Sequence, residues 1–169
     1  MRNILRIHVL AGLALALLIP TVAGAVDPAP QTQAATGKDA TVKTTAAKPV
    51  QPAHIQVQHI LIGFKGSVPG KPITRTQAEA KKLAYDILKS ARKGVSFDEL
   101  VKQHTDDQAP GIYGMSNTDV EPAAGEHARG GMVPAFGNVG FVLKVGKIGI
   151  ANYDQANSPY GWHIIKRLK

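Results

Sequence analysis

Hydrophobic and polar residues first form a regular pattern over residues 55–62. The segment begins with strict alternation and ends in a fully apolar run. This pattern is typical of a strand that is covered on both faces in its second half. Because strand side chains alternate with a period of two, His59 is expected to share one face with Val57 and Leu61. The folded part of the chain is therefore predicted to start with a strand.

Two helical patterns follow this strand. Thr76 and Glu79 have the spacing of a capping box, and apolar residues at helical intervals come directly after them. Gly94 fits the position just beyond the end of this helix. Ser96 and Glu99 repeat the capping spacing and predict a second, shorter helix.

The second half of the chain is less periodic. Residues 105–131 are rich in turn formers, and a short strand is predicted over 113–116. Pro134 suits the first turn of a further helix. Two last strands are predicted over 148–153 and 161–168. The order of strand, helices and strands predicts a small α+β domain.

The first 53 residues differ from the rest. Residues 1–25 combine Arg2 and Arg6 with a short apolar run and small residues up to Ala25, as in a secretory signal peptide. The run is short for a bilayer crossing of about 20 residues, so cleavage is expected, with a retained anchor as the alternative. Residues 26–53 are rich in Ala, Thr and Pro and lack aromatic residues, which predicts a disordered spacer. The folded domain is then expected over residues 54–169.

Composition narrows the classes of function. The net charge is +8, but the Lys and Arg residues are scattered and not interleaved with aromatic residues. This favours a solvated basic surface over a nucleic-acid-binding one. The chain has no cysteine, which excludes a disulfide framework, a thiol nucleophile and a thiolate metal site.

Four short blocks, in this order and at compatible spacing, resemble the parvulin family of peptidyl-prolyl isomerases. They are Gln58-His59-Ile60-Leu61-Ile62, Gly94-Val95-Ser96-Phe97-Asp98-Glu99-Leu100, Gly131-Met132-Val133-Pro134-Ala135-Phe136 with its continuation to Phe141, and Tyr160-Gly161-Trp162-His163-Ile164-Ile165. The resemblance implies an FKBP-like α+β fold, in which a four-stranded antiparallel sheet is wrapped by about three to four helices. The first and last strands would be central.

The resemblance also implies a set of catalytic residues. His59 and His163 would lie close together on one face of the sheet, and Ser158 is assigned to the same hydrogen-bond network. Asp107 would sit beside the substrate carbonyl. A carboxylate there disfavours negative charge on the oxygen and so weakens the amide resonance.

A second group of residues is expected to bind the substrate. The resemblance implies that Met132, Phe136 and Phe141 form an apolar pocket for the proline ring. Tyr113 belongs to the long segment 108–130, which should border the groove. Without the resemblance, these apolar residues would be read as ordinary core.

The expected function is peptidyl-prolyl cis/trans isomerisation that assists the folding of exported proteins. The partners would be proline-containing polypeptides, and the location the periplasm or cell envelope, with an extracellular location also open. No bond is broken in the reaction, so no cofactor or metal is expected. Two alternatives remain open: a non-catalytic chaperone module that binds unfolded or proline-containing segments, and a basic envelope protein that binds an anionic polymer. The loop after the first strand contains Lys65 and Lys71 but no pair of arginines. Because a pair of guanidinium groups is the usual way to bind a phosphate, specificity for phosphorylated substrates is not expected.

Overall fold

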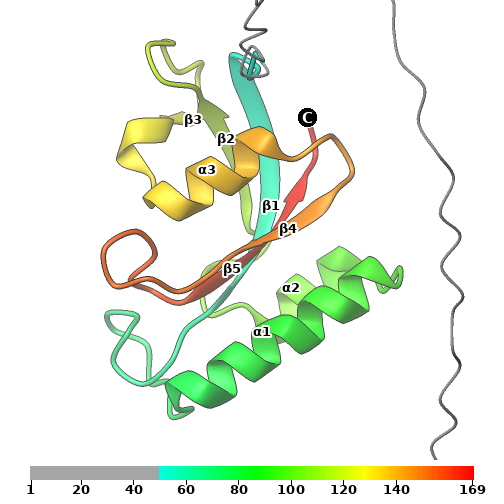
Figure 1. The fold of residues 1–169 in the computed structure, drawn as a ribbon, viewed down its shortest axis with the longest axis vertical. Helices are drawn as coiled ribbons and strands as arrows, with labels where there is room; N and C mark the ends of the chain where they lie inside the picture. The colour runs from blue at the N-terminus through cyan, green and yellow to red at the C-terminus, as the bar shows by residue number, and fades with distance from the viewer. Residues whose placement is uncertain (1–49) are drawn as a thin grey trace, which may run out of the picture. The chain divides into compact units, whose positions relative to one another are not determined.

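A computed structural model of the chain describes residues 50–169 (Figure 1). The elements are β1 (His54–Ile62), α1 (Gln77–Arg92), α2 (Phe97–His104), β2 (Ile112–Ser116), β3 (Glu126–Ala128), the short 3-10 helix η1 (Arg129–Gly131), α3 (Pro134–Val142), β4 (Ile148–Ala151) and β5 (Trp162–Arg167). The predicted signal peptide and the predicted spacer up to residue 49 lie outside the described residues. Within residues 50–169, no helix has the length and apolar character needed to span a bilayer.

β1 forms the centre of the sheet, whose strand order is β3-β2-β1-β5-β4. It pairs antiparallel with β2 and with β5, and β4 pairs antiparallel with β5. The α+β class and the central position of the first and last strands are thus confirmed. The sheet has five strands instead of the expected four, because residues 126–128 form a short strand parallel to β2. This strand is too short and too polar to produce an alternation signal in the sequence.

Alternate residues of β1 divide the core into two clusters, one on each face of the sheet. Figure 1 shows α1 and α2 on one side of the sheet and α3 on the other. Ile60 and Ile62 pack with the buried residues of α1 and α2, while Ile55 and Val57 pack with those of α3. His59 and Leu61 follow Val57 on the α3 face, since strand side chains alternate.

The helix ends agree with the sequence prediction. The Thr76 hydroxyl accepts a hydrogen bond from the Glu79 amide, and the Glu79 carboxylate accepts one from the Thr76 amide, which completes the capping box. Ser96 caps α2 through its hydroxyl. α3 begins at Pro134 and continues through Gly140. A Cβ at Gly140 would lie 3.2 Å from side-chain carbons of the strands below, so the glycine lets α3 pack closely on the sheet.

The chain just before β1 is hydrogen-bonded to the domain. The Pro52 and Ala53 carbonyls accept bonds from the side chain and backbone of Asn117, and the Gln51 side chain accepts one from Arg129. These three positions are the last ones that the sequence analysis assigned to the spacer.

Candidate active site

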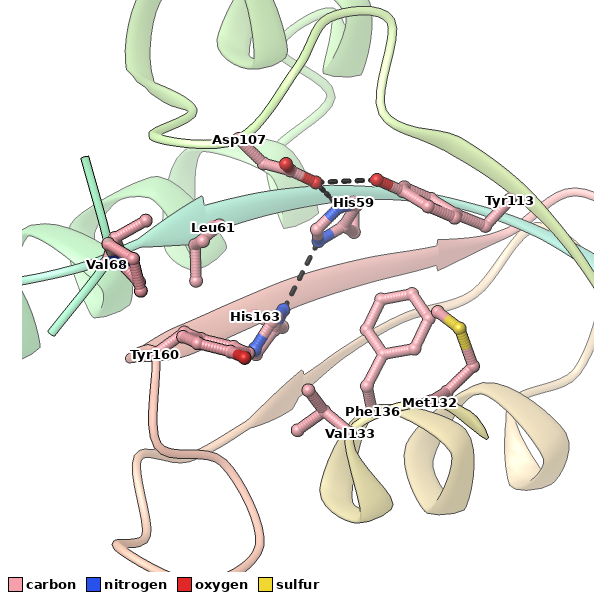
Figure 2. Close-up of a pocket in the computed structure, with 11 residues that line it drawn as sticks. His59, Leu61, Val68, Asp107, Tyr113, Met132, Val133, Phe136, Tyr160 and His163 are labelled. Carbon is pink, nitrogen blue, oxygen red and sulfur yellow. Dashed lines mark hydrogen bonds and ion pairs between the residues drawn. The ribbon is translucent and has the colours of Figure 1, made fainter. Parts of the chain in front are cut away.

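A pocket of about 320 Å³ lies on the α3 face of the sheet (Figure 2). Its size is near the lower end for small-molecule pockets, and apolar side chains dominate its lining. The lining residues come from β1, β2, β5, the start of α3 and several loops: His59, Leu61, Val68, Pro69, Asp107, Tyr113, Met132, Val133, Phe136, Tyr160 and His163.

The two central strands bring His59 and His163 together. Leu61 of β1 lies directly opposite His163 of β5, so His59 is the diagonal neighbour of His163 on the same face. Their Nδ1 atoms are 3.3 Å apart, and both side chains are buried. The rings are stacked, with an interplanar angle of 19°. The expected proximity of the two imidazoles is present.

Asp107 accepts two hydrogen bonds on one carboxylate oxygen. His59 Nε2 lies 3.0 Å and the Tyr113 hydroxyl 2.8 Å from Asp107 Oδ2, as Figure 2 shows. The hydrogen bond from His59 is the main reason that the pKa of Asp107 is lowered to about 2, and the bond from Tyr113 adds to it. Burial, followed by the Asp107 carboxylate, raises the pKa of Tyr113 to about 12. At neutral pH the carboxylate is therefore ionised, and the phenol is a donor.

The electrostatic environment keeps His163 neutral. Burial, reinforced by His59, lowers its pKa to about 3. Because the Asp107 carboxylate can only accept, His59 Nε2 carries a proton. In the pair of imidazoles, one Nδ1 donates to the other. His163 Nε2 is buried, and among residues 50–169 it has no hydrogen-bond partner.

Aromatic and aliphatic side chains form the wall opposite the imidazoles. The Phe136 ring meets His59 edge to face at 5.0 Å between centroids, and His163 at 5.4 Å. Met132 and Val133 precede it at the start of α3. The ring of Tyr113 meets His59 at 5.1 Å. The pocket thus presents apolar carbon next to the Asp107–His59–His163 chain.

Two predicted site residues lie elsewhere. The Ser158 hydroxyl donates to the Gly161 carbonyl at 2.8 Å and is fully buried in the turn before β5, so in this structure it bonds to neither imidazole. Phe141 does not line the pocket. It is five residues beyond Phe136, which rotates it by about 140° around the helix axis. Its ring is buried in the core below the guanidinium of Arg129.

The sequence analysis did not assign several pocket residues. Val133 and Tyr160 lie within the blocks that carry the family resemblance, so a closer reading of those blocks could have identified them. Val68 and Pro69 lie in loop 63–75, between β1 and α1, where the sequence gives only turn signals. The Ser67 hydroxyl in this loop donates to the Tyr160 carbonyl at 2.9 Å, which brings the loop to the pocket.

Among the described residues, no group of three or more His, Cys, Asp or Glu side chains has an arrangement that would hold a metal ion.

Comparison with known proteins gives three kinds of match. The family model of the PPIC-type PPIase domain matches residues 40–169. Chaperone SurA from Pseudomonas fluorescens is 29% identical over 115 residues, which are 68% of this chain and 22% of SurA. The chain thus spans about a fifth of the length of that relative.

Two solved structures share this fold. Peptidyl-prolyl isomerase ESS1 from Candida albicans matches with a TM-score of 0.55 and 24% identity, over 69% of this chain and 63% of that chain. The solution structure of TbPIN1 matches with a TM-score of 0.52 and 26% identity, over 69% of this chain and 98% of that chain. Both support the α+β architecture described above.

Proposed function

This chain belongs to the PPIC-type PPIase, or parvulin, family, and we propose that its pocket is a peptidyl-prolyl cis/trans isomerase active site. The observation that carries the proposal is the hydrogen-bonded chain Asp107–His59–His163 along one side of an apolar pocket. The proposed substrates are proline-containing polypeptides.

The reaction is limited by amide resonance. Partial double-bond character gives the peptide bond a rotation barrier of about 18–20 kcal/mol. Uncatalysed exchange at proline takes tens to hundreds of seconds at 25 °C. In the twisted transition state the resonance is lost, charge leaves the carbonyl oxygen, and the nitrogen regains its lone pair. A site that stabilises the twisted amide more than the planar one accelerates the exchange, by tenfold for each ~1.4 kcal/mol.

The side chains of the pocket can provide this difference. Met132 and Phe136 would hold the proline ring away from water, where the planar amide dipole is less stabilised. The ionised Asp107, placed beside the substrate carbonyl, would repel negative charge on its oxygen and so favour the twisted form. His59 and Tyr113 fix the orientation of this carboxylate through their two hydrogen bonds.

A protease-coupled assay on a prolyl peptide tests the proposal directly, with the full chain as catalyst. Phe136→Ala removes the ring that contacts both imidazoles and is expected to abolish most of the rate enhancement. Val142→Ala is the matched control, because Val142 lies on the same helix but is 67% exposed. A folded Phe136→Ala protein with the activity of the wild type would contradict the proposed site.

A second candidate function is a non-catalytic chaperone module. It is favoured by the match to a protein named as a chaperone, of which this chain covers 22%. The same pocket would then bind unfolded or proline-containing segments with little turnover. Binding of an unfolded client without acceleration of prolyl exchange would identify this function, and acceleration would identify the isomerase.

We also propose that the protein is exported, to the periplasm or cell envelope or beyond, and acts on newly exported polypeptides. The support is the signal-like pattern of residues 1–25. N-terminal sequencing of the protein from fractionated cells tests this. A mature chain that starts at Val26 in the exported fraction is expected, and a cytoplasmic chain that retains residues 1–25 would contradict it.

A further inference from the structure

Two loops that each contribute to the pocket lining are joined by one ion pair. Loop 63–75 carries Val68 and Pro69, and loop 105–111, between α2 and β2, carries Asp107. The guanidinium of Arg75, at the end of the first loop, binds the carboxylate of Asp106 in the second loop through two nitrogens, at 2.5 Å and 3.2 Å. Neither residue lines the pocket itself.

Both partners of this pair are also bonded to the end of β1. The Asp106 amide donates to the Leu61 carbonyl at 2.8 Å, and its carboxylate accepts from the Gly63 amide at 2.7 Å. Arg75 donates to the Gly63 carbonyl at 3.1 Å, and its own carbonyl accepts from the Lys65 amide at 2.9 Å. The ion pair thus fixes both loops to the strand that carries His59.

The position of Asp107 depends on its neighbour in the chain. Its amide donates to the Thr105 hydroxyl at 3.2 Å, and the same hydroxyl accepts from the Leu61 amide at 3.2 Å. The two residues before Asp107 are thus both anchored, Thr105 through its hydroxyl and Asp106 through its amide and carboxylate, which restrains the backbone at Asp107. With the backbone restrained in this way, the Asp107 carboxylate lies 3.0 Å from His59 Nε2.

The Arg75–Asp106 ion pair is partly shielded from solvent, so it can hold the two loops in a fixed geometry. The side chains of Arg75 and Asp106 are 28% and 12% exposed. Exposed pairs contribute little, whereas two parallel N–H···O bonds from a partly buried guanidinium hold a definite geometry. Lys82 and Asp86 on α1 form an exposed pair, at 81% and 59% exposure, and provide the contrast within the same molecule.

We propose that Arg75 and Asp106 are positioning residues for prolyl isomerisation: their ion pair holds Asp107 against His59 and, at the same time, sets loop 63–75 against the pocket. The inference rests on the proposed function of the pocket. Neither Arg75 nor Asp106 lines the pocket, so the pair would act through Asp107 and through loop 63–75.

Displacement of Asp107 and displacement of loop 63–75 should have different kinetic effects. Arg75→Ala removes the bonds that join the two loops, although Asp106 keeps its bonds to Leu61 and Gly63. The kcat should still fall by about tenfold or more, since a displacement of about 1 Å in a site can cost about 10²-fold. KM should rise as well, because Val68 and Pro69 lose their fixed position. Ser67→Ala removes the bond from loop 63–75 to the Tyr160 carbonyl and the bond that the same hydroxyl accepts from the Phe64 amide, but it leaves the bonds of Asp106 in place. It should therefore raise KM and leave kcat nearly unchanged.

Three further variants separate positioning from stability. Lys82→Ala breaks the exposed pair on α1 and should leave kcat and KM unchanged. Arg75→Lys keeps one charged bond to Asp106 and should recover part of the lost kcat. Asp106→Asn keeps the shape of the side chain and should resemble Arg75→Ala. All assays are run below the midpoint of thermal unfolding of each variant.

A readout that needs no turnover completes the test. The ring nitrogen signals of His59 in NMR spectra report its bond to Asp107, and they should shift in Arg75→Ala and Asp106→Asn but not in Lys82→Ala. If both pair variants are folded and keep the kinetics and the His59 signals of the wild type, the inference is wrong. If the wild type itself does not accelerate prolyl exchange, the proposed function fails, while the NMR comparison still decides whether the pair positions Asp107.

Discussion

Acidification should destabilise the domain through His163. An unfolded histidine has a pKa near 6.5, whereas burial lowers the pKa of His163 in the folded domain to about 3. Below pH 6.5 the unfolded chain therefore takes up a proton that the folded domain excludes. Folding stability falls as the pH decreases from about 6.5 to about 3, and it is fully retained above that range.

The size of the effect follows from this difference in pKa. Each pH unit within the range corresponds to about 1.4 kcal/mol, so stability should fall by about 2 kcal/mol between pH 7 and pH 5. A domain is typically stable by only about 5–15 kcal/mol, so the loss is measurable. Asp107 acts in a different window, because its pKa falls from about 3.9 in the unfolded chain to about 2 in the folded domain. Its stabilising contribution is therefore complete above about pH 4 and is lost only as the pH falls below that value.

Urea unfolding at pH 7, 6 and 5 measures the slope. The wild type should show it, and His163→Gln should lose most of it, because the buried titrating group is gone. His127→Gln, which removes an exposed imidazole from β3, is the matched control and should keep the wild-type slope. An equal slope in His163→Gln and wild type would refute the reasoning, as would a His163 ring that titrates near pH 6 in NMR spectra.

Three other changes have defined outcomes. Asp107→Asn keeps the side-chain shape but removes the charge, so kcat/KM for a prolyl peptide should fall at least about tenfold; wild-type kinetics would argue against the electrostatic role. Gly111→Ala places a Cβ 2.5 Å from the His59 carbonyl at a φ of +68°, so urea unfolding should show a loss of about 1–3 kcal/mol or more. Unchanged stability there would mean that the loop relaxes freely. Thr76→Ala removes the cap of α1 and should cost about 1 kcal/mol in the same assay, and a loss of a tenth of that would contradict the capping role.

Local signals in the sequence were sufficient for most of the secondary structure. The capping box at Thr76 and Glu79, the cap at Ser96 and the proline at the start of α3 each act within one helical turn. The alternation in β1 likewise depends only on neighbouring residues and on which face is buried. The pattern therefore identified the helices and the long strands, and it missed β3, whose three residues pair with β2 only because the intervening chain returns there.

The pocket was only partly predictable. His59 and His163 lie together, as the family resemblance implied, and Met132 and Phe136 line the pocket. The hydrogen bond between Asp107 and His59 was not part of that expectation. A motif records which residues recur, but it does not give the direction in which a side chain points. For that reason it did not separate Phe136 from the core residue Phe141 five positions later.

The amino-acid sequence by itself determined the helices, the central strands and the α+β class, because these depend on propensity, capping and hydrophobic periodicity over short distances. Only the tertiary structure decided that Ser158 bonds within its own turn, that Tyr113 and His59 share one oxygen of Asp107, and that Arg75 reaches Asp106. Such contacts join residues that are far apart in the chain, or select one of several partners for a polar group. Their geometry is fixed by the packing of the whole domain, which no local pattern contains.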